Sequence, residues 1–307
     1  KIIDYLIREK IFPRKSIFSS LKTYMFILFF VLSSGFKSIR NFLFPRYAKR
    51  LFMKQLEIYH QSIDKGFNDS NRSSFTDCVN HYQNILSLLP TILIKHAFPS
   101  IIPGVLSIRL MQKLAKDPVD ALALTRAVES NPTTEMNLDL WKLCVLIRQD
   151  ETTLKLFENE TTNSLVRMFL DESFEENIQL KMNEFFQNYG CRGIGEIDIG
   201  RKRWSEEPQV VIEQIKNYLK IHNPDKTIDK LHDQSKQTAY EAFSNIEKQL
   251  KYPFIQRPLI NFIFNRIKIL FSLRDCPKFY GLIQTFCKCR HHLLSKAHLA
   301  VKQKFSQ

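Results

Sequence analysis

Two cations stand four residues apart in the segment Leu273-Arg-Asp-Cys-Pro-Lys-Phe-Tyr280. Arg274 and Lys278 lie on either side of a proline that interrupts a helix, so both could converge on one anionic group, Arg by its planar fork and Lys as a point charge. Tyr280 could add a hydroxyl. The alternative is a solvated basic helix end, and the residues alone favour that alternative.

A second polar cluster lies in a glycine-bearing segment. Four of the eight glycines fall between Gly190 and Gly200, which concentrates the backbone freedom of the chain at one place. Within this segment Glu196 and Asp198 alternate with isoleucines, which predicts a short extended piece over 196–199 with both carboxylates on one side. The arginines around the carboxylates are Arg192, Arg201 and Arg203.

This cluster has two interpretations. In the functional one, the carboxylates orient the arginines towards a phosphate or a polyhydroxylated ligand, and the segment forms a pocket wall. In the structural one, the charges form a self-contained ion-pair network that holds an irregular loop against helices, with Trp204 and Pro208 as an apolar clasp. The residues alone leave the two about equal.

Other chemistries have weaker support. Cys287-Lys-Cys-Arg-His-His292 contains soft metal ligands, but on a helix Cys287 and His291 share one face while Cys289 and His292 share another, so we expect no metal site. No glycine pattern matches a nucleotide-binding loop, and no histidine accompanies a nucleophile motif. We therefore assign no catalytic residue and no cofactor to this chain.

The elements that must position these residues are mainly helices. Apolar spacing and proline or Asx starts predict the helices 45–61, 79–89, 92–114 broken by Pro99 and Pro103, one opening at Asp117-Pro118, one at Asn131-Pro132, 208–221, 228–251, 258–273 and 278–305. The predicted fold class is all-α, with the one short extended segment. We expect an N-terminal helical lobe at 1–115 and a second helical domain at 116–307.

Composition bounds the partners and the compartment. The formal charge of +14 favours anionic partners, but Lys and Arg are spread along many helices without a nucleic-acid module, so we expect no nucleic acid partner. Six cysteines without disulfide density indicate a reducing compartment, the cytoplasm. The apolar run 23–36 is short for a membrane span, and membrane association through it is the alternative.

Three segments carry distinctive motifs. The longest is Tyr189-Gly-Cys-Arg-Gly-Ile-Gly-Glu-Ile-Asp-Ile-Gly-Arg-Lys-Arg-Trp-Ser-Glu-Glu-Pro208, and the others are Asn131-Pro-Thr-Thr-Glu-Met-Asn-Leu-Asp-Leu-Trp141 and Leu273-Arg-Asp-Cys-Pro-Lys-Phe-Tyr280. Together they resemble one family, the phosphoenolpyruvate synthase-like proteins of the rifampicin phosphotransferase type. The longest segment is similar to the family's Y-G-x-R-x-x-G-E-I-D-I-x-x-x-R-W-x-E-x-P signature, and all three stand in the family's order.

The resemblance implies a place in a larger enzyme. Family members combine an ATP-grasp domain, a helical domain that binds the acceptor, and a swivelling domain whose histidine carries phosphate between them. Their reaction converts ATP, acceptor and water to AMP, phosphate and phosphorylated acceptor, with ATP and Mg as the implied cofactors. Only the helical domain is matched here, so the expected partners are a small-molecule acceptor and the two other domains.

The resemblance also changes the weight of the site candidates. Arg274 and Lys278, with Tyr280, become the expected substrate-binding residues, because the family places an Arg and a Lys at the acceptor pocket. Asp275 stands where the family usually has Glu. The residues Arg192, Glu196, Asp198, Arg203 and Trp204 become mainly architecture, with a pocket-wall role second.

Two hypotheses follow. In the leading one, the chain is the acceptor-binding portion of an ATP-dependent phosphotransferase and is inactive alone; its first residue, Lys1, and a beginning inside an apolar pattern favour a fragment. In the alternative, a truncated relative without catalytic domains serves as a binding or membrane-associated module. The acceptor itself is open between pyruvate, a rifamycin-like polyketide and another metabolite.

Overall fold

The computed structural model describes residues 34–68, 74–115, 117–128, 131–221 and 227–305. Throughout these ranges the chain forms helices joined by turns, and no strand occurs in them. The predicted all-α fold class is confirmed. Most of the apolar run 23–36 lies outside the described residues.

The helices are described here in chain order. After a helical stretch at 34–43 they are α3 (Pro45–Phe67), α4 (Phe75–Ile92), the π-helix η2 (Leu93–Ala97), α5 (Phe98–Leu114), α6 (Pro118–Ala123), the 3-10 helix η3 (Leu124–Ala127), α7 (Pro132–Gln149), α8 (Glu151–Asn159), α9 (Thr162–Leu170), α10 (Glu176–Tyr189), α11 (Gln209–Leu219), α12 (Ile228–Lys248), α13 (Pro253–Leu270), the 3-10 helix η4 (Ser272–Arg274), the π-helix η5 (Pro277–Ile283) and α14 (Gln284–Phe305).

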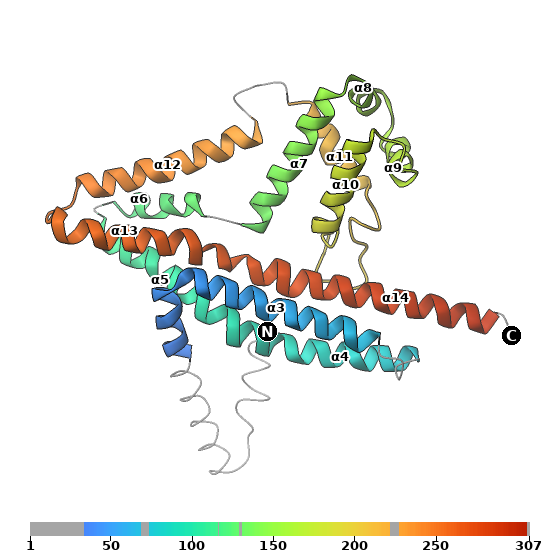
Figure 1. The fold of residues 1–307 in the computed structure, drawn as a ribbon, viewed down its shortest axis with the longest axis horizontal. Helices are drawn as coiled ribbons and strands as arrows, with labels where there is room; N and C mark the ends of the chain where they lie inside the picture. The colour runs from blue at the N-terminus through green and yellow to red at the C-terminus, as the bar shows by residue number, and fades with distance from the viewer. Residues whose placement is uncertain (1–33, 69–73, 116, 129–130, 222–226, 306–307) are drawn as a thin grey trace, which may run out of the picture.

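One long helical run organises the molecule. α13, η4, η5 and α14 follow one another across its whole length, and Figure 1 shows them as the orange-to-red band. α3, α4 and α5 pack along one side of this band. On the other side of the band lie α6 and α12, beside α13. The group α7 to α11 lies on the same side, nearer the α14 end of the band.

The buried side chains form four clusters, and the long run contributes to each of them. Ile283 belongs to the cluster among α7 to α11, Ile267 to the one with α5 and α12, Leu273 to the one with α3, and Cys289 to the one with α3 and α4. Because this run of consecutive helices supplies all four clusters, the position of η4 and η5 is fixed by packing on both sides.

The helix starts expected from the sequence are present. The Asp117 carboxylate accepts a hydrogen bond from the backbone of Val119 at the start of α6, and the Asn131 side chain does the same at the start of α7. Each satisfies backbone N–H groups that have no partner within the helix.

Prolines break the helices less than expected. Pro99 and Pro103 leave the run from Phe75 to Leu114 continuous, whereas the sequence predicted an interruption. The π-helical turn η2 ends two residues before Pro99, and such a turn accommodates backbone groups that lose their usual partner beside a proline. Pro258 likewise lies inside α13, which begins five residues earlier than predicted, at Pro253.

The extended piece predicted at 196–199 is wrong. The segment turns repeatedly: the backbone N–H of Asp198 donates to Gly195 O at 2.8 Å, and that of Arg201 donates to Asp198 O at 3.2 Å. Ile197 is exposed rather than paired with a neighbouring strand. Gly195 has φ of +71°, which starts the turn and removes the alternation on which the prediction rested.

One helical run in the described residues is long and apolar enough to cross a membrane. It is Phe75–Leu114, and 28% of its most apolar stretch is buried inside the protein. Length and composition are the whole basis of this finding, and the core helices of soluble proteins pass the same criterion.

Candidate functional site

Three segments that are far apart in the sequence meet at one cavity. The start of α7, the glycine-bearing segment after α10 and the η4–η5 turn all contribute to its wall. Its volume is about 320 Å³. The lining residues are Asn131, Thr133, Thr134, Arg192, Asp275, Lys278, Phe279 and Ile283.

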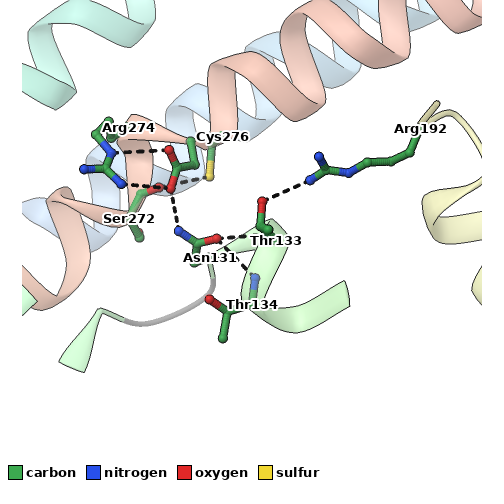
Figure 2. A network of polar contacts seen from close by, with 8 residues as sticks. Asn131, Thr133, Thr134, Arg192, Ser272, Arg274 and Cys276 are labelled. Carbon is green, nitrogen blue, oxygen red and sulfur yellow. Dashed lines mark hydrogen bonds and ion pairs between the residues drawn. The ribbon is translucent and has the colours of Figure 1, made fainter. Parts of the chain in front are cut away.

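Asn131 connects two of these segments. Its side-chain oxygen accepts hydrogen bonds from the backbone N–H groups of Thr133 at 2.9 Å and Thr134 at 3.3 Å, which caps α7. Its Nδ2 donates to Asp275 Oδ2 at 2.5 Å, and the Arg274 guanidinium donates to the same carboxylate at 3.3 and 3.4 Å (Figure 2). The helix start and the η4–η5 turn are therefore held together by one amide.

Arg192 brings in the glycine-bearing segment. Its Nη2 donates to Thr133 Oγ1 at 3.1 Å (Figure 2). Its guanidinium carbon lies 4.8 Å from the centre of the Phe279 ring. The residue is 9% exposed, so its charge acts in a poorly solvated place. A cation stacked on an aromatic face and bound to a hydroxyl keeps a fixed orientation.

Glu196 holds two cations beside the cavity. Its Oε1 lies 3.0 Å from Lys278 Nζ and 3.7 Å from Arg192 Nη1. The carboxylate side chain is 14% exposed, whereas that of Lys278 is 57% exposed. Lys278 therefore stands at the rim with part of its charge available to solvent.

A second, more open hollow adjoins the first. Its volume is about 630 Å³, and it shares Arg192 and Lys278 with the first cavity. The rest of its wall comes from the glycine-bearing segment, with Gly193, Gly195, Glu196, Ile197, Asp198 and Trp204.

Glycine allows this segment to fold back on itself. A Cβ at position 193 would lie 2.6 Å from Lys202 O, too close for any side chain. The two arms are joined there by a hydrogen bond from the Trp204 N–H to Arg192 O at 2.7 Å. The close approach aims Arg192 at the start of α7.

The predicted site residues differ in where they lie. Lys278 lines both hollows, but Arg274 lines neither and lies behind Asp275, against the Phe271 ring. Tyr280 is half-buried between two apolar clusters and does not line them either. Burial, followed by nearby Cys276 and Glu135, raises the pKa of Tyr280, so its hydroxyl stays protonated at neutral pH.

The predicted wall residues also separate into two groups. Glu196, Asp198 and Trp204 line the second hollow with Arg192. Arg203 is 1% exposed and lies behind the wall, where its Nη2 donates to Asp198 O at 3.2 Å. The Asp198 carboxylate faces solvent and pairs with Arg201 at 3.8 Å.

Sequence reasoning missed Asn131, Thr133 and Phe279 as site residues. The sequence indicates only a helix start at Asn131-Pro132, and Phe279 stands in the motif 273–280 without a role of its own. An Asx cap that begins a helix within a family motif is a usable signal, because its side chain has a second polar end free for a tertiary contact.

The cysteines and histidines of α14 serve separate contacts. Cys287 is partly exposed, whereas Cys289 is fully buried in the cluster with α3 and α4. His292 stacks on Phe67. Within the described part of the chain, no group of three or more His, Cys, Asp or Glu side chains could hold a metal ion.

The arrangement suits an anionic ligand. Arg192 and Lys278 present positive charge at the shared wall, and the hydroxyls of Thr133 and Thr134 stand at the N-terminal end of α7, where the helix dipole favours negative charge. Among the residues that line the first cavity, Arg192 and Lys278 are positive and only Asp275 is negative. Glu196, which contacts both cations, and Asp198 line the second hollow.

Comparison with known proteins identifies the family. The model for the rifampicin phosphotransferase fourth domain matches residues 96–275, more than half of the chain. The chain belongs to this family. The match includes the start of α7, the glycine-bearing segment and Asp275, while Lys278 follows three residues after its end.

Individual relatives cover the same region. The chain is 25% identical over 185 residues to a rifampicin phosphotransferase of Bacillus cereus, a match of 58% of this chain and 21% of the relative. The rifampicin phosphotransferase of Bacillus subtilis is 27% identical over 186 residues, again 58% and 21%. That of Streptomyces sviceus is 23% identical over 180 residues, 57% and 20%. The chain thus spans about a fifth of the length of the curated relatives it matches.

Proposed function

We propose that this chain is the acceptor-binding helical portion of an ATP-dependent, cytoplasmic phosphotransferase. The observation that carries the proposal is the convergence of the three family motifs on one cavity whose shared wall holds Arg192 and Lys278. All six cysteines are free thiols, which fits a reducing compartment.

The two cations have a clear use in phosphoryl transfer. Negative charge spreads over the oxygens of the transferring group, and fixed positive groups in a poorly solvated site stabilise it. Arg192 is buried and oriented, whereas Lys278 is at the rim and could move from Glu196 to an incoming phosphate. Arg274 acts one step further out by fixing Asp275, and through it Asn131.

The rest of the reaction belongs to other parts of the protein in this proposal. An ATP-binding domain and a phosphohistidine domain would supply the phosphoryl group, and ATP, acceptor and water would give AMP, phosphate and phosphorylated acceptor. Mg and ATP would be held by those parts. The chain's own residues bind and orient the acceptor and neutralise charge.

The test uses the full-length protein and measures the two half-reactions separately: phosphorylation of histidine by ATP, and phosphorylation of the acceptor. Lys278→Met should lower the rate of acceptor phosphorylation about 100-fold, the usual effect of removing one charge-stabilising group. ATP-dependent phosphorylation of histidine should stay unchanged, because that step occurs elsewhere. Both are measured with labelled ATP, and pyruvate and a rifamycin serve as acceptors.

Lys155→Met is the matched control. Lys155 forms an ion pair with Glu151 on α8, as Lys278 does with Glu196, but lies away from the cavity. It should leave both half-reactions intact. Equal loss of both half-reactions in Lys278→Met would contradict the assignment of the cavity.

A second candidate function is a membrane-associated module without catalysis. The run Phe75–Leu114 favours it, because this run is apolar and carries a row of exposed side chains, among them Leu88, Phe98, Ile102, Leu106 and Leu110. Co-sedimentation with anionic vesicles tests it. Binding that Ile102→Glu with Leu106→Glu abolishes would support the membrane function, and absence of binding would reject it.

A further inference from the structure

A basic groove lies where the helical stretch 34–43 and the start of α3 meet α13. Its volume is about 390 Å³. The wall includes the cations Arg46, Arg266 and Lys268 and the aromatic residues Phe44 and Tyr47. None of the residues that line the basic groove is acidic, and none lines either of the two hollows described above.

Both walls of the basic groove come from elements without carboxylates. The described residues 34–56 contain no Asp or Glu but include the cations Lys37, Arg40, Arg46, Lys49, Arg50 and Lys54. Between Pro253 and Leu270, α13 also lacks Asp and Glu, and it carries Arg257, Arg266 and Lys268. These described residues therefore give the groove a positive potential, which attracts anions.

The first turn of α3 adds backbone donors to this wall. α3 begins at Pro45, and the side chain of its N-cap residue, Phe44, makes no capping hydrogen bond. The backbone N–H groups of Arg46 and Tyr47 donate to no described residue. N–H groups at the positive end of a helix dipole suit the oxygens of an anion.

Arg266 fixes the two walls relative to each other. Its Nε donates to Phe42 O at 3.0 Å, and its Nη2 donates to Leu43 O at 3.0 Å. Both carbonyl groups lie at the C-terminal end of the stretch 34–43, where they have no partner within their own helix. Arg266 thus joins α13 to the segment that leads into α3, and its charge stays at the groove.

The other wall residues offer two kinds of contact. Arg46, which is exposed, supplies a planar fork of donors, and Lys268 supplies a point charge. Phe44 is 61% exposed and Tyr47 is 51% exposed, so both rings present apolar surface beside these cations. The guanidinium carbon of Arg40 lies 5.2 Å from the centre of the Tyr47 ring, a contact that orients the ring.

We propose that the basic groove binds the phosphate group of an organic phosphate ester. The backbone N–H groups of Arg46 and Tyr47 and the side chains of Arg46 and Lys268 contact the phosphate oxygens. The organic part of the ester lies against Phe44 and Tyr47. A phosphate suits the groove because its several oxygens can accept bonds from α3 and α13 at the same time. The ester is either a soluble metabolite or the headgroup of an acidic lipid, since both carry the same group.

Protection of arginine side chains from phenylglyoxal tests the location of the site in the native chain. Glycerol 3-phosphate should slow the modification of Arg46 several-fold, as measured by mass spectrometry of peptides. Arg50 is the matched control, because it is exposed on the same helix but does not line the groove. Its rate of modification should stay the same. Equal protection of both arginines, or protection of neither, overturns the proposal.

Two substitutions test the contribution of Arg46 to affinity. Arg46→Met should weaken the binding of glycerol 3-phosphate about tenfold, as expected for the loss of one hydrogen bond to a charged group. Arg50→Met should change it less than about twofold, because an exposed charge away from the ligand is screened by salt. Both are measured by calorimetry in a chain that also carries Lys278→Met, so that the cavity of the proposed function contributes little. The result is thus independent of that function.

Vesicles distinguish the two sources of the ester. Phosphatidylcholine vesicles are compared with vesicles that also contain phosphatidic acid, which carries glycerol phosphate at a membrane surface. Co-sedimentation that requires phosphatidic acid, is lost in Arg46→Met and persists in Ile102→Glu with Leu106→Glu identifies a lipid headgroup. Binding of glycerol 3-phosphate without co-sedimentation identifies a soluble ligand. Absence of binding in both arms, or binding that Arg46→Met leaves unchanged, overturns the proposal.

Discussion

At the scale of single residues, Glu196 bears most directly on whether the glycine-bearing segment only stabilises the fold or also forms a pocket wall. Among the described residues it is the one carboxylate that contacts both Arg192 and Lys278, and it is largely buried. Asp198, two residues on, pairs with Arg201 where both side chains are more than half exposed. The two acids look alike in the sequence, but the different exposure of their ion pairs predicts different contributions to stability.

We expect Glu196→Gln to lower the free energy of unfolding by about 1–3 kcal/mol, because it leaves the buried Arg192 without its carboxylate. Asp198→Asn is the control and should cost less than about 0.5 kcal/mol, as exposed pairs do. Urea denaturation at neutral pH measures both. Equal effects would show that burial does not distinguish the two acids.

His60 makes stability depend on pH. Burial, then the charge of Lys288, lowers its pKa from 6.5 to about 4, while a hydrogen bond with the Tyr280 backbone and the charge of Asp64 oppose this. Its Nε2 has no hydrogen-bond partner. The unfolded chain therefore takes up a proton below pH 6.5 that the folded protein binds only near pH 4, so stability is full above pH 6.5 and is lost as pH falls towards 4.

Between pH 7 and pH 5 the loss from His60 should be on the order of 2 kcal/mol. His96 and His232 also have lowered pKa values, caused mainly by burial, and act in the same direction. Comparison of the native protein with His60→Leu removes the contribution of His96 and His232, because both proteins contain these two histidines. The free energy of unfolding of the native protein minus that of His60→Leu, measured by urea denaturation across this range, should fall as the pH falls. A difference that stays constant would contradict the assignment.

At the scale of elements, the contact of α5 with α13 depends on a missing side chain. A Cβ at Gly104 would lie 2.9 Å from the Leu270 carbonyl carbon and 3.0 Å from Phe271 N, and both are backbone atoms that cannot rotate away. The two helices would have to separate. Close packing of this kind transmits small changes in volume over the whole contact.

Gly104→Ala should therefore destabilise the protein by about 1–3 kcal/mol, the usual cost of overpacking. Gly35→Ala provides the comparison, because nothing lies within 4 Å of its Cβ position. Since that glycine is helical, the alanine should raise stability by up to about 1 kcal/mol. Thermal denaturation of the two variants should thus show shifts of opposite sign.

The elements also show what the sequence could predict. Asn131-Pro132 and Asp117-Pro118 begin helices as expected, because capping is a local interaction. Pro103 and Pro258 do not end helices, because tertiary packing offsets a local cost. The family motifs indicated the region of the site, but only the fold shows that Arg192 meets Thr133, since 59 residues separate them.

At the scale of the whole molecule, the long run from Pro253 to Phe305 joins all four apolar clusters. Three of those clusters combine residues before 115 with residues of this run; the pairs Met111 and Ile267, Phe52 and Leu273, and Ile63 and Cys289 are examples. The described residues before 115 therefore share their core with the C-terminal helices. Loss of one cluster should therefore weaken the helix that supports the others.

We expect the chain to unfold in a single cooperative transition. Both tryptophans, Trp141 and Trp204, pack in or against the cluster among α7 to α11, so their fluorescence reports that region, whereas far-ultraviolet circular dichroism reports all helices. In urea the two signals should change at the same midpoint, which is the test for a two-state transition. Independent lobes would instead give a circular dichroism change with two steps, only one of which coincides with the fluorescence. Gly104→Ala provides a second test, because the contact that it alters lies far from both tryptophans in the sequence. If the molecule is cooperative, the variant must still shift the fluorescence midpoint. An unchanged fluorescence midpoint would establish separate domains.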